Sequence, residues 1–166
     1  MKVADIMTRE VITIFPETKV TEAAKVLFDH NFNGLPVISA IGEVVGLVTE
    51  ASLLAQDSFG MHIPSLIKML QDFKVLNQTV SGKDKKEFRR ILNATAEAVM
   101  ETDFSWIGPE SPVSELLRIF NEKHANPVPV LTPERKLAGI VSRSDIIKLV
   151  SRTGEAELDF LFGGGK

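Results

Sequence analysis

The stretch Gly139-Ile140-Val141-Ser142-Arg143-Ser144-Asp145 decides the fold of this chain. Its apolar start, followed by a serine and an acid three positions later, predicts a buried strand that runs directly into a helix. An imperfect copy, Gly46-Leu47-Val48-Thr49-Glu50-Ala51-Ser52, lies 93 residues upstream (139 minus 46). The two stretches indicate that the chain repeats one folding unit.

The offset of 93 residues holds without a gap from residue 3 to residue 54. It aligns Met7 with Met100, and it aligns Pro36-Val37 with Pro129-Val130. Chance similarity does not keep its register across strands, a helix and turns together, so the repeat is a strong signal.

Each copy has the pattern of a β-α-β-β-α unit. In the first copy, residues 11–14, 35–38 and 44–48 are predicted strands, Thr18 is a candidate helix cap, and a second helix begins near Thr49. The apolar face of the first helix comprises Val20, Ala23, Ala24 and Leu27 in copy one, and Val113, Leu116, Leu117 and Phe120, after Ser111-Pro112, in copy two.

A unit of roughly 50 residues is too small to bury a good core alone. The sequence therefore predicts an α+β fold of the α/β-sandwich type, with two units packed strand to strand around a pseudo-twofold axis. This arrangement creates two equivalent clefts at the junction. In each cleft, the strand-to-helix corner of one copy faces the first strand of the other.

We expect four segments: repeat 1 at 1–57, a helical insert at 58–94, repeat 2 at 95–152 and a tail at 153–166. Helical spacing in the insert predicts two helices, around Ile63–Phe73 and Phe88–Leu92, with a packing or dimer-contact role. The apolar tail with its glycine end is either a docking segment or disordered.

The composition and the net charge narrow the class of protein to which the chain can belong. The chain has 166 residues, 44% hydrophobic and 25% charged, which is typical of soluble globular proteins. A formal net charge of −3 gives no support for nucleic-acid binding. The opening residues Met1 to Ile6 include an acid within their short apolar run, so we do not expect them to act as a secretion signal. No apolar run approaches the roughly 20 residues that a membrane span needs. We expect a cytoplasmic protein without a membrane span.

Enzyme chemistry finds little support in the sequence. The chain has no cysteine, which excludes disulfides, zinc thiolate sites and cysteine nucleophiles. His30, His62 and His124 lack metal-ligand spacing, and there is no glycine-rich phosphate loop before a lysine. We expect neither a metal site nor a catalytic one.

Ser142 and Asp145 allow two interpretations. Ser-x-x-Asp before an apolar run is a helix N-cap with an acid in the first turn. The same helix start presents free N–H groups that suit a phosphate, so that Ser142 would donate to a phosphate oxygen and Asp145 would accept from a ribose diol. The first copy has Thr49 but carries Ser52 in place of the acid, so we expect unequal clefts.

The doubled motifs resemble a tandem pair of CBS domains, the cystathionine β-synthase repeat, which together form a Bateman module. The matching features are Asp5-Ile6-Met7 and Ala98-Val99-Met100, Leu35-Pro36-Val37 and Val128-Pro129-Val130, and the Gly-to-Ser/Thr-x-x-Asp endings. The resemblance covers most of the chain outside the insert and the tail.

The resemblance implies that an adenosine nucleotide (AMP, ADP or ATP, with or without Mg²⁺) binds between the repeats. The main cleft would use Ser142, Asp145, Ile140, Met7, Ile12, Phe32, Asn33 and Gly34. The second, degenerate cleft would use Thr49, Leu47, Ser52, Met100, Ser105, Asn126 and Pro127. Candidate cations for the phosphate are Arg143, His30, Lys123 and His124.

The expected function is therefore a non-enzymatic regulatory sensor that forms a homodimer and signals to an unidentified effector protein. S-adenosylmethionine and NAD-type molecules are alternative ligands. A second alternative is a dimerisation scaffold with closed clefts, in which the lining residues are simply core. A third is a regulatory fragment of a transporter or an enzyme.

Overall fold

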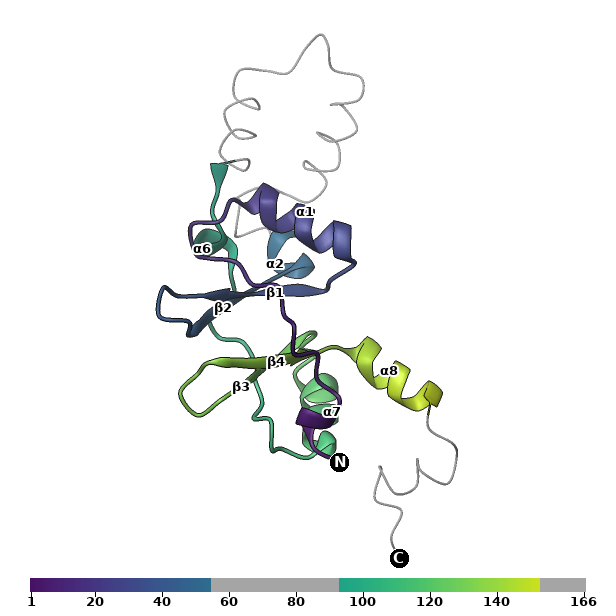
Figure 1. The fold of residues 1–166 in the computed structure, drawn as a ribbon. Coiled ribbons are helices and arrows are strands. Elements are labelled where there is room, and N and C mark those ends of the chain that lie inside the picture. Colours follow the sequence, from purple (N-terminus) through teal and green to yellow (C-terminus); the bar gives the residue numbers. More distant parts are fainter. Residues whose placement is uncertain (55–92, 153–166) are drawn as a thin grey trace, which may run out of the picture.

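The computed structural model describes residues 1–54 and 93–152 (Figure 1). The helices predicted in the insert and the expected tail lie outside the described residues. The described part is a mixed helix and strand fold with two hairpins at its centre, as the sequence predicts. In Figure 1, α1 and α2 lie over the outer face of the first hairpin, and α7 lies over the outer face of the second.

The two repeats contain corresponding elements in the same order, although the opening one is a 3-10 helix in repeat 1 and an α-helix in repeat 2. Repeat 1 has η1 (Val3–Asp5), α1 (Val20–His30), β1 (Gly34–Ile38), β2 (Val44–Thr49) and α2 (Glu50–Leu54). Repeat 2 has α6 (Ala96–Val99), α7 (Val113–Glu122), β3 (Val128–Leu131), β4 (Leu137–Val141) and α8 (Arg143–Arg152).

Each repeat has one antiparallel hairpin. Leu35 pairs with Val48 in the β1–β2 ladder, and Val128 pairs with Val141, each 93 residues further on, in β3–β4. Both ladders shift register at the same place, between Val37 and Ile38 and between residues 130 and 131. The offset of 93 thus holds for the strand pairing as well as for the sequence.

The strand predicted at residues 11–14 is wrong in extent. Only Ile14 pairs, through a single parallel bridge to Val37, and Ile107 forms the same bridge to Val130. Ile14 donates its N–H to the Pro36 carbonyl at 3.0 Å. The next rung toward residue 12 would need an N–H from Pro36, which proline lacks, so the ladder stops there.

The first helix of each repeat begins slightly later than predicted. Lys19 and Pro112 are the N-cap residues, and α1 and α7 start at Val20 and Val113. Thr18 does not cap α1, because its hydroxyl accepts the N–H of Phe15 at 3.0 Å and closes the preceding turn. The apolar faces of the two helices are buried as their spacing predicts.

The two repeats exchange their opening segments. Val3, from the start of repeat 1, is fully buried in the core of repeat 2 beside Leu116 and Val141. Ala96 and Val99, from the start of repeat 2, are buried in the core of repeat 1. In Figure 1, η1 (purple) accordingly lies beside α7, and α6 lies beside α1. Each core is therefore completed by a segment of the other repeat.

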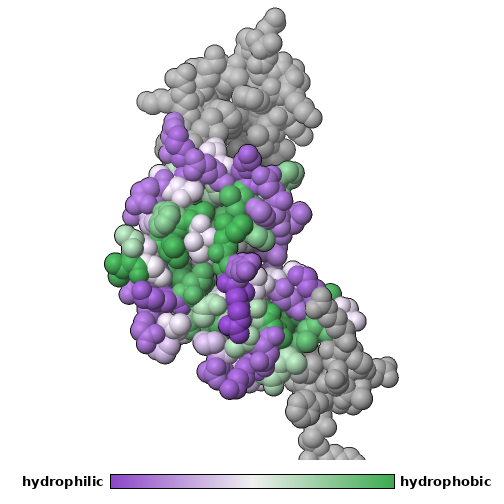
Figure 2. Space-filling model, viewed as in Figure 1, coloured by the Kyte–Doolittle hydropathy of each residue, from purple (hydrophilic) through white to green (hydrophobic). Residues whose placement is uncertain are grey.

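A third apolar cluster joins the two hairpins. It consists of Val44, Leu47, Phe104 and Leu131, which come from both repeats. In the view of Figure 2, hydrophobic residues come to the surface around this central strand layer, while hydrophilic residues gather over the outer helices. This interface holds the repeats together and leaves a cleft on each side of the pseudo-twofold axis.

Candidate functional site: two clefts at the repeat junction

The junction contains two clefts, each walled by both repeats. Cleft 1 has a volume of about 210 Å³ and is lined by Thr8, Glu10, Val11, Ile12, His30, Asn31, Phe32, Asn33, Gly34, Pro127, Ile140, Ser142, Ser144, Asp145 and Lys148. Cleft 2 has a volume of about 320 Å³ and is lined by Asn33, Leu47, Thr49, Glu50, Ala51, Glu101, Asp103, Phe104, Ser105, Lys123, His124, Ala125, Asn126 and Pro127.

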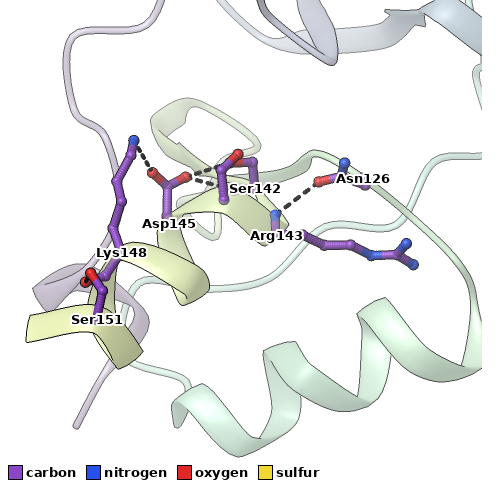
Figure 3. Close-up of polar contacts among 7 residues, drawn as sticks. Asn126, Ser142, Arg143, Asp145, Lys148 and Ser151 are labelled. Carbon is purple, nitrogen blue, oxygen red and sulfur yellow. Dashed lines mark hydrogen bonds and ion pairs between the residues drawn. The ribbon is translucent and has the colours of Figure 1, made fainter. Parts of the chain in front are cut away.

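Ser142 and Asp145 form the start of α8 in cleft 1 (Figure 3). One carboxylate oxygen of Asp145, Oδ2, accepts both the backbone N–H of Ser142 at 2.8 Å and its hydroxyl at 2.7 Å. Ser142 Oγ also lies 3.0 Å from Ser144 Oγ. The structure thus shows the helix cap that the sequence predicts for this pair, and the cap uses one of the two carboxylate oxygens.

The second carboxylate oxygen of Asp145 is bound by a lysine. Lys148 donates from Nζ to Asp145 Oδ1 at 3.2 Å, one helical turn further along α8. The lysine side chain is 65% exposed, whereas the Asp145 side chain is only 16% exposed. Because the ammonium end of this pair is exposed to water, holding it contributes little to stability, and the lysine can exchange this partner at small cost.

Arg143, a candidate cation for a phosphate, points away from cleft 1. Its guanidinium donates to the Phe120 carbonyl at 2.8 Å, and its backbone N–H donates to Asn126 Oδ1 at 3.0 Å. Figure 3 shows the side chain extending to the opposite side of the helix start from Asp145. The basic side chains that do line this cleft are those of His30 and Lys148.

The repeat 1 wall of cleft 1 combines apolar and polar groups. Ile12 is 39% exposed although it is a large aliphatic residue. The rings of His30 and Phe32 stack with their centroids 5.0 Å apart. Gly34 marks a close approach between the repeats, because a Cβ there would lie 2.8 Å from Cδ of Pro127. This contact separates the two clefts.

Met7 is not part of the cleft 1 lining. Its side chain lies on Gly139, where an added Cβ would be 2.7 Å from the sulfur. Met100 occupies the equivalent place on Gly46, with its sulfur 2.5 Å from such a Cβ. Both methionines therefore pack the junction behind the clefts.

Cleft 2 contains the matching helix start of α2. Thr49 and Ser52 cap each other, since the N–H of Thr49 donates to Ser52 Oγ at 2.8 Å and the N–H of Ser52 donates to Thr49 Oγ1 at 3.0 Å. Thr49 also donates from its hydroxyl to Glu101 Oε1 at 3.0 Å. Ser52 is 5% exposed and lies behind the lining rather than in it.

The structure thus brings most predicted residues together in two groups. Ser142, Asp145, Ile140, Ile12, Phe32, Asn33 and Gly34 line cleft 1, and Thr49, Leu47, Ser105, Asn126 and Pro127 line cleft 2. Met7, Met100 and Ser52 do not reach these walls.

Several lining residues were not predicted from the sequence. Lys148 could have been found from its spacing, because it follows Asp145 by three positions on the same helix. Thr8 and Glu101 directly follow the two aligned methionines and are themselves 93 residues apart.

The family profile of the CBS domain matches residues 3–57 and 96–152. The chain belongs to the CBS domain family. An uncharacterized protein of Methanocaldococcus jannaschii is 29% identical over 150 residues, which cover 90% of this chain and 32% of that protein. The chain spans from about a quarter to about half of the length of three curated relatives that it matches.

Two solved CBS pairs share the fold. The CBS domain pair of protein MJ0100, in complex with 5′-methylthioadenosine and S-adenosyl-L-methionine, superposes with a TM-score of 0.64 at 24% identity, over 92% of this chain and 97% of that one. CBSX2 of Arabidopsis thaliana, in complex with AMP, superposes with a TM-score of 0.67 at 21% identity, over 92% and 97%. Within residues 1–54 and 93–152, no helix combines the length and apolar character of a membrane span.

Proposed function

We propose that the chain is a regulatory, non-catalytic module that binds an adenosine nucleotide in cleft 1 and changes the angle between its repeats. The observation that carries this proposal is a cleft that joins a capped helix start from repeat 2 to an exposed apolar side chain of repeat 1. The ligands of the two solved CBS pairs support it, since both bind molecules that contain adenosine.

The base of the nucleotide would lie between Ile12 and Ile140. Ile12 is 39% exposed and lines the cleft, so covering it with a flat ring removes apolar surface from water. Among the described residues, the backbone groups of Val11 and Ile12 have no hydrogen-bonding partner, because the rung at Ile14 is the last of the ladder. Those groups can therefore read the edge of an adenine ring.

The ribose and the phosphate would lie at the start of α8. Asp145 Oδ1 is held only by the exposed Lys148 among the described residues, so a ribose diol can take the place of the lysine. The released ammonium group would then meet the phosphate together with the Ser142 hydroxyl. The Ser142 hydroxyl has a single proton, so it would leave Oδ2 for the phosphate, while Oδ2 would keep the bond from the Ser142 N–H, which fixes the orientation of the carboxylate.

Isothermal titration calorimetry with AMP, ADP and ATP tests this proposal, with NAD and S-adenosylmethionine as rival ligands. Asp145→Asn keeps an acceptor for the cap but removes the charge, and it should weaken the preferred nucleotide by about 10- to 100-fold, the range of a charged hydrogen bond. Asp103→Asn makes the same change in cleft 2 and should leave this affinity unchanged. Absence of binding by all five ligands would instead favour the dimerisation scaffold.

We also infer that two chains associate into a homodimer in the cytoplasm and act on a separate effector protein. The exposed apolar residues of α8, Ile147 at 68% and Val150 at 38%, favour such an association. Analytical ultracentrifugation tests it, because Ile147→Glu should convert dimers to monomers. Wild-type sedimentation as a monomer at all concentrations would reject the dimer.

A further inference from the structure

Thr8 and Glu101 occupy equivalent places in the two clefts. Thr8 exchanges two backbone hydrogen bonds with Ile140, both of 2.9 Å. Glu101 exchanges the same pair with Leu47, at 3.0 and 2.9 Å. The backbones are therefore fixed alike, and the difference between the clefts at this place is a side chain: a hydroxyl in cleft 1 and a carboxylate in cleft 2.

The Glu101 carboxylate lies at the helix start of cleft 2. It accepts the Thr49 hydroxyl at 3.0 Å, and Thr49 is the counterpart of Ser142, the residue proposed to meet a phosphate in cleft 1. A negatively charged group of the chain itself thus occupies the polar corner that a phosphate would need. The Ser142 hydroxyl of cleft 1 is likewise donated to a carboxylate, so the difference in cleft 2 is the added charge of Glu101, which a phosphate placed there would lie against.

The other charged groups that line cleft 2 act in the same direction. Glu50 and Asp103 add two carboxylates, whereas Lys123 is the lining ammonium group and His124 adds an imidazole ring. In cleft 1, by contrast, Asp145 is already paired with Lys148, and Glu10 is the remaining lining carboxylate beside His30. Cleft 2 is therefore the more negative of the two.

We propose that Glu101 is a specificity-determining residue that excludes phosphate-bearing ligands from cleft 2. The chain then binds one nucleotide rather than two, and cleft 2 is left to adenosine ligands without a phosphate. This inference rests on the proposed function of cleft 1.

Binding stoichiometry provides the test. Glu101→Thr installs the residue of cleft 1 and keeps the backbone bridge to Leu47, while Glu101→Gln keeps an acceptor for Thr49 and removes only the charge. The wild type should bind one AMP per chain. Both variants should gain a second AMP site, with an affinity at cleft 2 raised at least about tenfold. Glu10→Gln, a matched loss of charge in cleft 1, should not add a site.

Adenosine, which lacks the phosphate, separates a charge effect from a change of shape. Its affinity for cleft 2 should differ by less than about threefold between the wild type and Glu101→Gln, because no charge repulsion is relieved. Two AMP sites in the wild type, or an unchanged single site in both variants, would overturn the inference.

Failure of the proposed function gives a different pattern. If the wild type binds none of AMP, ADP and ATP but Glu101→Thr binds one of them, the role of Glu101 stands and the proposal for cleft 1 falls. If neither protein binds any of the three, both fall. Thermal melting of each variant checks that it is folded. If Glu101→Thr does not fold, Glu101→Gln alone provides the test.

Discussion

Adding one methyl group at Gly139 or at Gly46 tests the contact that joins the repeats. A Cβ at Gly139 would lie 2.7 Å from the sulfur of Met7 and 2.8 Å from the backbone oxygen of Thr8. A Cβ at Gly46 would meet only the side chain of Met100 within the same range, at 2.5 Å from the sulfur, 2.8 Å from Cγ and 3.0 Å from Cβ. One clash therefore includes a backbone atom and the other does not.

The two substitutions should differ in cost for this reason. Overpacking a well-filled site costs about 1–3 kcal/mol. Gly139→Ala should lie at the upper end, about 3 kcal/mol, because the Thr8 oxygen also accepts the N–H of Ile140 at 2.9 Å and cannot move without straining that bond. Gly46→Ala should cost about 1–2 kcal/mol. For a chain of this size the former lowers the melting temperature by about 6–12 °C.

Urea denaturation of double variants checks the reasoning. Met100→Ala should remove most of the cost of Gly46→Ala, which gives a favourable coupling energy of about 1–2 kcal/mol. Met7→Ala should relieve Gly139→Ala only in part, because the Thr8 oxygen stays in place. If Gly139→Ala is neutral within about 0.5 kcal/mol, or if the two couplings are equal, the backbone contact does not carry the cost that we assign to it.

Three further outcomes are expected. Val3→Ala removes two methyl groups from a fully buried site and should cost about 2 kcal/mol by denaturation, with faster amide exchange in repeat 2 than in repeat 1. Asp145→Ala removes the acceptor of the Ser142 N–H and should cost about 1 kcal/mol, whereas Asp145→Asn should cost less. The hydrogen bond that Lys2 donates to Glu110, together with the attraction between their charges, raises the pKa of Lys2 above its ordinary value of 10.5. Its small contribution is therefore present at neutral pH and lost as the pH rises through that raised pKa, so the melting temperatures of wild type and Glu110→Gln should converge above it.

Much of the fold follows from one property of the sequence, its repetition. The offset that aligns Met7 with Met100 also aligns Gly46 with Gly139, and these four residues form the same contact twice. Because the same contact forms in both copies, the same residue types recur at equivalent positions, and the repeat can be recognised from the sequence alone. The strand at residues 11–14 was not predictable in extent, because its end depends on a partner strand that carries Pro36.

The candidate site was predictable only where its residues follow a local pattern. Ser142 and Asp145 stand three residues apart at a helix start, and that spacing alone brings them together. Glu101 reaches Thr49 across the junction, from a segment distant in sequence. Such a contact depends on how the repeats pack, which spacing within one element does not reveal. The roles of all these residues stay predictions until ligands are tested.

The exchange of opening segments determines when each core can form during translation. Residues 1–54 leave the ribosome before Ala96 and Val99 exist, so the core of repeat 1 stays open while the chain grows. Val3 is made first but finds its buried place only when Leu116 and Val141 have been added. The core of repeat 1 can close only once Ala96 and Val99 have emerged, and the core of repeat 2 only after Val141, so repeat 2 completes its folding last.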